Sequence, residues 1–309
     1  MPILEVKKLR KTFQSVVAVD NISFSVENGE IFTIIGPNGA GKTTTLEMIE
    51  GLQTPDSGEI QLKGMNWKSD SRRIKQIIGV QPQTSALFDL LTVYESLDVF
   101  AGLYKRSRSI DEILDFINLT EHRNKRVKIL SGGQKQRLAI GIALVNDPDI
   151  LFFDEPTTGL DPQVRRNIWD IVLKLKSLGK TTILTTHYME KAEKLSDRVC
   201  IVDQGKIIAL DTPQNLIQVL SKEREIHLSF PASIKDAREI IQVVKEYPGV
   251  TKVKAEQNML IFSTTSPEES LYHLFKYTTE NQIKVEQIGI KDLSLEDVFL
   301  SYTGKEWRD

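Results

Sequence analysis

The chain has 309 residues and balances 40 Lys and Arg against 42 Asp and Glu, and this net charge of −2 gives no reason to expect nucleic acid as a partner. Its single cysteine, Cys200, excludes an internal disulfide, and no cluster of cysteines and histidines has the spacing of a zinc site. Charges interrupt the N-terminal segment and no apolar run approaches the roughly 20 residues of a membrane-spanning helix, so we expect a cytosolic chain without a signal peptide.

The first predicted elements are an antiparallel start and a buried strand. Ile22, Phe24 and Val26 alternate as in a half-buried strand, and the Asn-Gly pair at 28–29 is typical of a turn. The apolar run 31–35 predicts a fully buried strand.

A parallel sheet with crossover helices is predicted next. A helix is expected from about Gly41 to a stop at Gly51. The short apolar runs 149–154 and 181–187 are each followed by helix-like sequence, as in a parallel α/β sheet. From 84 to about 147 helical patterning predominates, which predicts a helical insert.

A second, smaller domain is predicted beyond residue 220, where the pattern changes to short strands and two amphipathic helices. Residues 226–230 alternate as in a strand, and apolar residues recur at i, i+3, i+4 and i+7 over 237–244. Ser-Pro-Glu-Glu at 266–269 supplies an N-cap serine, a first-turn proline and a capping-box glutamate for the second helix. A strand near 283–290 completes a β-α-β-β-α-β unit.

A phosphate-binding loop is predicted between the strand 31–35 and the helix after it, because "GPNGAGKTT" matches G-x-x-x-x-G-K-[ST]. Its glycines let backbone N–H groups turn toward phosphate oxygens, while Lys42 reaches the outer phosphates and Thr43 can ligate magnesium. The predicted nucleotide-binding residues of this loop are Gly36, Pro37, Asn38, Gly39, Ala40, Gly41, Lys42, Thr43 and Thr44.

Two carboxylates, Asp154 and Glu155, end the predicted strand 149–154. Asp154 is suited to hold magnesium through water, and Glu155 to orient or deprotonate a water that attacks the γ-phosphate. Carboxylates at a strand end are also compatible with ordinary solvation of a loop. Their occurrence together with the phosphate loop favours the catalytic interpretation.

A second glycine-centred motif, "LSGGQ" at 130–134, opens a helix. Ser131 caps the helix, and the amides of Gly132 and Gly133 could bind another phosphate. Taken alone, the motif is compatible with a plain helix cap.

These motifs, together with "GLD" at 159–161 and the strand-terminal His187, resemble the ATP-binding cassette family in order and approximate spacing. The resemblance covers residues 3 to about 215. It implies an ABC-type P-loop ATPase domain in which two copies meet head to tail, with the signature motif of one, Ser131 to Gln134, closing over the nucleotide of the other.

The resemblance also assigns single residues. Phe13 is similar to the aromatic residue that stacks on adenine, although it could equally be a core residue. Gln83 is similar to the glutamine that contacts magnesium and the attacking water, with Gln81 as the alternative register. Asp161 resembles the residue that couples the two sites across the dimer, and His187 the one that contacts the γ-phosphate.

A hydrophobic stretch at 84–97 corresponds to the region that receives the membrane protein in related transporters. We expect most of its apolar residues in the core and some in a docking groove. They are Leu87, Phe88, Leu90, Leu91 and Val93.

The resemblance therefore implies an ATP- and magnesium-dependent subunit of an ABC transporter. The sequence around His187 resembles that of exporters whose membrane domain is a separate chain. Expected domains are the ATPase at 1–220, with a helical subdomain at about 84–147, and a small α+β accessory domain at 221–309. Expected partners are a multispanning permease and a second ATPase subunit, at the inner face of the cell membrane. The alternatives are a soluble relative that acts on DNA or the ribosome, and a regulatory module in which the accessory domain binds a ligand or another copy.

Overall fold

The computed structural model describes most of the chain, namely residues 2–84, 86–220, 223–230, 237–256 and 258–304. Two compact units are distinguished, Met1–Pro213 with Phe299–Asp309, and Gln214–Val298. Ser85, in the predicted docking stretch, lies outside the described residues, as does the side chain of Ala237.

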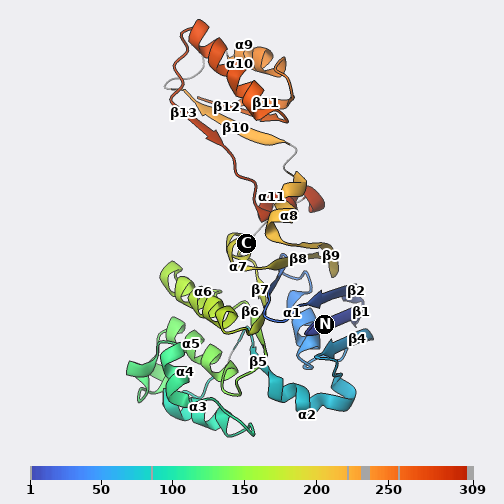
Figure 1. Ribbon diagram of the computed structural model, residues 1–309, viewed down its shortest axis with the longest axis vertical. Helices are drawn as coiled ribbons and strands as arrows, with labels where there is room; N and C mark the ends of the chain where they lie inside the picture. Colours follow the sequence, from blue (N-terminus) through green and yellow to red (C-terminus); the bar gives the residue numbers. More distant parts are fainter. Residues whose placement is uncertain (1, 85, 221–222, 231–236, 257, 305–309) are drawn as a thin grey trace. The chain divides into compact units, whose positions relative to one another are not determined.

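An antiparallel sheet opens the first unit. It consists of β1 (Leu4–Phe13), β2 (Val16–Val26) and β4 (Ser57–Leu62), in the order β2-β1-β4 (Figure 1). The alternation predicted at the end of β2 is confirmed, because Ile22, Phe24 and Val26 are buried there while Ser23 and Ser25 are more accessible. Alternation of this kind places one face of the sheet on the core.

A six-stranded sheet forms the centre of the first unit, and every neighbouring pair in it is parallel except the last. In spatial order its strands are β5 (Ile78–Gln81), β6 (Ile150–Asp154), β7 (Thr181–Thr186), β3 (Ile31–Ile35), β8 (Arg198–Asp203) and β9 (Lys206–Asp211). The predicted parallel sheet is thus confirmed, and Cys200 is buried in β8.

Helices cover this sheet and form the insert. The helices around the sheet are α1 (Lys42–Ile49), α2 (Trp67–Ile77), α6 (Pro162–Ser177) and α7 (Met189–Leu195). The insert contains α3 (Val93–Ala101), α4 (Ile110–Phe116), the short 3₁₀ helices η1 (Thr120–His122) and η2 (Val127–Ile129), and α5 (Gly132–Ala143). In Figure 1 the insert helices gather below α6, at the β5 side of the sheet. The helical insert is confirmed.

The apolar residues of the predicted docking stretch, 84–97, differ in burial. Val93 is fully buried and Leu87 packs partly against the core, but Phe88 is 52% and Leu90 72% exposed. Val93 belongs to the core and Leu87 packs on it, while the docking groove at the exposed Phe88 and Leu90 stays a prediction. Apolar side chains in loops before a helix have no periodicity from which burial can be inferred.

The second unit has the predicted β-α-β-β-α-β order with a four-stranded antiparallel sheet, β11-β12-β10-β13. Its elements are β10 (Arg224–Ser229), α9 (Ala237–Lys245), β11 (Val250–Glu256), β12 (Met259–Thr264), α10 (Pro267–Glu280) and β13 (Gln287–Ile290). Its apolar core includes Leu228, Val244, Phe262 and Leu274. The chain passes between the two units within α8 (Pro213–Leu220) and α11 (Leu295–Thr303).

The predicted capping box of α10 is wrong. Ser266 does occupy the N-cap and Pro267 the first position, but the Ser266 side chain makes no capping hydrogen bond. Instead, the Ser266 N–H donates to Thr264 Oγ1 at 3.0 Å, and Thr264 Oγ1 also lies 2.7 Å from Ser270 Oγ. Thr264 of the preceding strand thus accepts the Ser266 N–H, which the sequence pattern had assigned to the side chain of Glu269.

Candidate functional site

The loop between β3 and α1 fits only glycine at two positions. A Cβ on Gly36 would lie 2.3 Å from the carbonyl oxygen of Val202, and a Cβ on Gly41 would lie 2.3 Å from that of Ala18. Gly41 also has a φ of +98°, where residues with a side chain are strained. The loop backbone is therefore pressed against β8 and β2 and held in one path.

The start of α1 offers backbone donors to an anion. Gly41 occupies the N-cap and supplies no side-chain cap, so the first-turn amides of the helix have no such partner. These amides and the helix dipole favour a phosphate group at this end. Lys42 is 5% exposed and its Nζ donates to the carbonyl oxygens of Gly36 at 2.7 Å and Pro37 at 3.2 Å, so the ammonium lies over the loop.

The end of β6 brings two carboxylates to this loop. Thr43 Oγ1 donates to Asp154 Oδ1 at 3.3 Å, and Lys42 Nζ lies 3.5 Å from Glu155 Oε1. Asp154 and Glu155 are 4% and 8% exposed. Burial lowers the pKa of Lys42, and attraction to Glu155 and Asp154 opposes this effect. The arrangement places an ammonium, a hydroxyl and two carboxylates around one point where phosphate can bind.

Glu155 is held ionised by its neighbours. Thr158 Oγ1 donates to Glu155 Oε2 at 2.7 Å, and His187 Nδ1 lies 2.8 Å from the same oxygen. Burial alone would raise the pKa of Glu155, but these two contacts and the charge of Lys42 outweigh it and leave the pKa below its usual value. An ionised carboxylate can accept a proton or a hydrogen bond from water, which is what a general base requires.

Thr185 links the backbone amide of Glu155 to the carboxylate of Asp154 and was not predicted. Its Oγ1 accepts the N–H of Glu155 at 2.9 Å and donates to Asp154 Oδ1. Glu155 has a φ of +45°, so the chain turns sharply as it leaves β6 and this amide needs a partner off the strand. The register pairs Asp154 with Thr185 across parallel strands, which a sequence pattern alone does not supply.

We expect Thr185→Val to lower ATP turnover by roughly 10- to 100-fold, because it removes the partner of the Glu155 amide and releases the Asp154 side chain. Thr185→Ser keeps the hydroxyl and is expected to stay within about threefold of the parent chain. Steady-state phosphate release measures both. Equal losses in the two variants would contradict the assigned role of the hydroxyl.

The helix α1 ends at a buried carboxyl group, Glu50. Its side chain is 6% exposed, and Oε1 has no hydrogen-bond partner among the described residues. Burial, with the negative charges of Asp154 and Glu47, raises its pKa to about 8 from 4.5. The folded chain therefore keeps a proton that the unfolded chain loses between these pH values, so the free energy of unfolding falls as pH rises toward 8.

Glu50→Gln should remove this pH dependence, because the amide is neutral throughout. Relative to the parent chain, the variant is expected to gain free energy of unfolding progressively between about pH 5 and pH 8.5, reaching a few kcal/mol. Urea unfolding at several pH values within this window measures the difference. A difference that stays constant with pH would contradict the buried, proton-retaining carboxyl group.

The second glycine motif opens α5 with a reciprocal cap. Ser131 Oγ accepts the N–H of Gln134 at 3.3 Å, and Gln134 Oε1 accepts the N–H of Ser131 at 2.9 Å. A Cβ on Gly133 would lie 2.4 Å from Val164 Cγ1, so close packing against α6 requires glycine there, whereas nothing lies within 4 Å of a Cβ on Gly132. The phosphate-loop cluster consists of Lys42, Thr43, Asp154, Glu155 and His187. No hydrogen bond or ion pair found among the described residues joins Ser131–Gln134 to this cluster.

In the part of the chain that the structure describes, the other predicted site residues form no hydrogen bond or ion pair with the phosphate-loop cluster. Phe13 ends β1 and is 43% exposed, so it is not a core residue, and Lys11 Nζ lies 5.4 Å from its ring centre. Gln83 is exposed beyond β5, while Gln81 is buried within that strand. Asp161 caps α6 by accepting the N–H groups of residues 163 and 164, a role that its position before a proline could have indicated.

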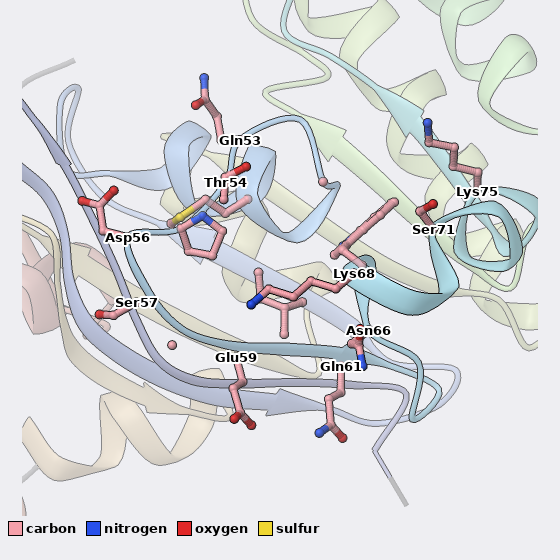
Figure 2. Close-up of a pocket in the computed structure, with 16 residues that line it drawn as sticks. Gln53, Thr54, Asp56, Ser57, Glu59, Gln61, Asn66, Lys68, Ser71 and Lys75 are labelled. Carbon is pink, nitrogen blue, oxygen red and sulfur yellow. The ribbon is translucent and has the colours of Figure 1, made fainter.

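A cavity of about 720 Å³ lies elsewhere in the first unit, and its lining includes none of the predicted site residues. Figure 2 shows its polar side chains, which come from the segment after α1, from β4, including Glu59 and Gln61, and from α2, including Lys68 and Lys75. The predicted catalytic side chains therefore lie at the phosphate loop and not in this cavity.

Comparisons with known proteins find similar sequences over the whole length of the chain. A family model described as "ABC transporter" matches residues 19–158. The chain is 38% identical over 313 residues to the "Nod factor export ATP-binding protein I" of Ralstonia nicotianae, covering 100% of this chain and 96% of that one. It is 35% identical to the "Linearmycin resistance ATP-binding protein LnrL" of Bacillus subtilis, covering 99% and 100%.

Solved structures match about two thirds of the chain or slightly more. The ADP conformation of MJ1267, an ATP-binding cassette of an ABC transporter, has a TM-score of 0.63 at 27% identity and covers 70% of this chain and 92% of that one. A dimeric post-hydrolysis state of the cassette MJ0796 with ADP and Pi has a TM-score of 0.61 at 28% identity, covering 68% and 98%.

Proposed function

The chain belongs to the ABC transporter family, and from this premise we propose that it is the ATP-hydrolysing subunit of an exporter whose membrane-spanning part is a separate chain. The observation that best supports ATPase activity is that the phosphate loop contacts the carboxylates at the end of β6. Lys42 lies beside Glu155, and Thr43 donates to Asp154. The export direction is supported by the relatives, one named for Nod factor export and one for linearmycin resistance.

The site residues have different roles in nucleotide binding and hydrolysis. The loop amides and Lys42 bind the phosphates, because a helix start and a buried ammonium both favour negative charge. Glu155 orients or deprotonates the attacking water, and His187, 2.8 Å from its carboxylate, fixes that carboxylate and contacts the γ-phosphate. Phe13, exposed at the end of β1, stacks on the adenine.

Magnesium fits this donor set. Thr43 and Asp154 present oxygen atoms 3.3 Å apart, and oxygen is the ligand that magnesium prefers. We assign these two residues and Gln83 as the protein groups that hold the ion. When bound, magnesium neutralises phosphate charge.

Two copies act together in the proposal. Ser131, Gly132, Gly133 and Gln134 of one copy close over the nucleotide bound by the other, and Asp161 couples the two sites. No hydrogen bond or ion pair between described residues joins the start of α5 to the phosphate loop, which is compatible with this exchange. Each nucleotide would then favour the closed dimer, because it contacts both copies only in that state.

A multispanning membrane chain is the proposed partner, at the inner face of the membrane. Among the described residues, no helix combines the length and the apolar character needed to cross a bilayer. Phe88 and Leu90, both exposed before α3, supply apolar surface for such a partner. ATP-driven closure would pass to it through Gln83 and the helical insert.

A pull-down tests the proposed partner. Tagged Glu155→Gln is incubated with ATP and detergent-solubilised native membranes, and co-purifying proteins are identified, with Lys42→Ala, in which ATP binding is expected to be weakened, as the control. Stoichiometric recovery of one multispanning protein supports the exporter. Recovery of ribosomes or DNA, or of nothing from membranes, would favour a soluble ATPase of the same family.

A further inference from the structure

The cap of α5 has a third member outside the glycine motif. Gln134 Nε2 lies 2.7 Å from Nε2 of His122, which belongs to η1 and is twelve residues earlier in the chain. The backbone of His122 is itself held at both ends, because its N–H donates to Leu119 at 2.9 Å and its carbonyl accepts from Lys125 at 2.9 Å. The imidazole is therefore presented from a fixed turn.

The backbone N–H of Ser131 determines which atoms donate and which accept in the contacts from Ser131 through Gln134 to His122. The N–H of Ser131 can only donate, so the atom of Gln134 that faces it at 2.9 Å must be the carbonyl oxygen Oε1. The amide nitrogen of Gln134 then faces His122, and an amide nitrogen can only donate. In this contact His122 Nε2 must therefore be the acceptor.

We propose that His122 is a positioning residue for Ser131, acting through Gln134. An acceptor at His122 Nε2 fixes which way the Gln134 amide points and so keeps Oε1 on the Ser131 N–H. Without that acceptor the Gln134 side-chain amide can rotate. Its NH₂ group would then face the Ser131 N–H, which is also a donor, and the hydrogen bond to Ser131 would be lost. The importance for turnover depends on the proposed function, in which Ser131 binds the nucleotide held by another copy.

Amide hydrogen exchange in the full chain tests the contact. His122→Leu removes the acceptor and is expected to speed exchange of the Ser131 amide by roughly fivefold. His122→Lys, which offers only donors, should behave in the same way. His122→Gln can present an oxygen and should stay within about twofold of the parent chain, as should Glu121→Gln, the matched control at an exposed site in the same turn.

Unchanged exchange in both His122→Leu and His122→Lys would overturn the proposal. Exchange in His122→Gln as fast as in His122→Leu would also overturn it, since loss of packing and not of an acceptor would then be responsible. Having two acceptor-free variants of different shape keeps the test valid should one of them fail to fold.

A second measurement separates this proposal from the proposed function. In the Glu155→Gln background, ATP-dependent dimerisation is measured by analytical ultracentrifugation for His122→Leu, His122→Gln and Ser131→Ala. We expect His122→Leu and Ser131→Ala to weaken the dimer by roughly fivefold or more and His122→Gln to restore it. The amide of Ser131 could exchange faster in His122→Leu while neither His122→Leu nor Ser131→Ala weakens the dimer. That result would support the contact between His122 and Gln134 and contradict the nucleotide-binding role of Ser131.

Discussion

Glu155→Gln is expected to retain ATP binding and to lose ATP turnover by at least roughly 100-fold. Glutamine keeps the shape of the side chain and an oxygen that can accept from Thr158 at the 2.7 Å contact, but it cannot accept a proton. With ATP the variant should accumulate as a dimer, because hydrolysis no longer releases the state that nucleotide favours. Phosphate release and size-exclusion chromatography with ATP measure the two effects.

The matched control for this substitution is Glu190→Gln. Glu190 is an exposed carboxylate at the start of α7, and hydrogen bonds from Lys194 and Lys191 lower its pKa to about 2, so it is ionised as well, but its ion pairs are with these two lysines and not with Lys42. Turnover in this variant should stay near that of the parent chain. Near-normal turnover in Glu155→Gln would remove Glu155 as the catalytic carboxylate.

Lys42→Ala is expected to weaken ATP binding itself, by roughly 10- to 100-fold, and to abolish turnover at moderate ATP concentrations. The buried ammonium bonds the loop at Gly36 and Pro37 and lies 3.5 Å from Glu155, so its loss removes a charge-assisted phosphate contact and also leaves a buried carboxylate without its cation. Isothermal titration calorimetry with ATP in magnesium buffer measures the affinity.

Lys63→Ala provides the comparison, because Lys63 pairs with Asp149 on the exposed surface and should affect neither affinity nor turnover. A Lys42→Ala chain that binds ATP as tightly as its parent would show that this ammonium does not contact the phosphates.

The sequence predicted the site best where a motif and an element boundary coincide. Lys42 and Glu155 were placed at a helix start and a strand end, and parallel strands bring such ends to one edge of a sheet. Their contact therefore followed from local patterns once the parallel order was recognised. The same reasoning placed Ser131 at the start of α5, where the structure shows a complete capping box.

Residues that act through register or through a distant turn could not be predicted. Thr185 reaches Asp154 because β6 and β7 pair in one register. His122 reaches Gln134 because the 3₁₀ turn η1 folds back beside α5. Strand β5, which contains only four residues, was also missed, since its glycine and its buried polar Gln81 hide the apolar run that marks a strand.

The central claim is that each ATP site is completed by the other copy, and a mixing experiment tests it most directly. Lys42→Ala and Ser131→Ala chains are each expected to be nearly inactive alone, because each homodimer has both sites damaged. In a head-to-tail mixed dimer both damaged parts fall in one site and the other site is intact. Equal mixing should therefore recover roughly a quarter of parental turnover, since half of the dimers are mixed and each retains one of two sites. Turnover that stays at the level of the two separate variants would contradict the shared site.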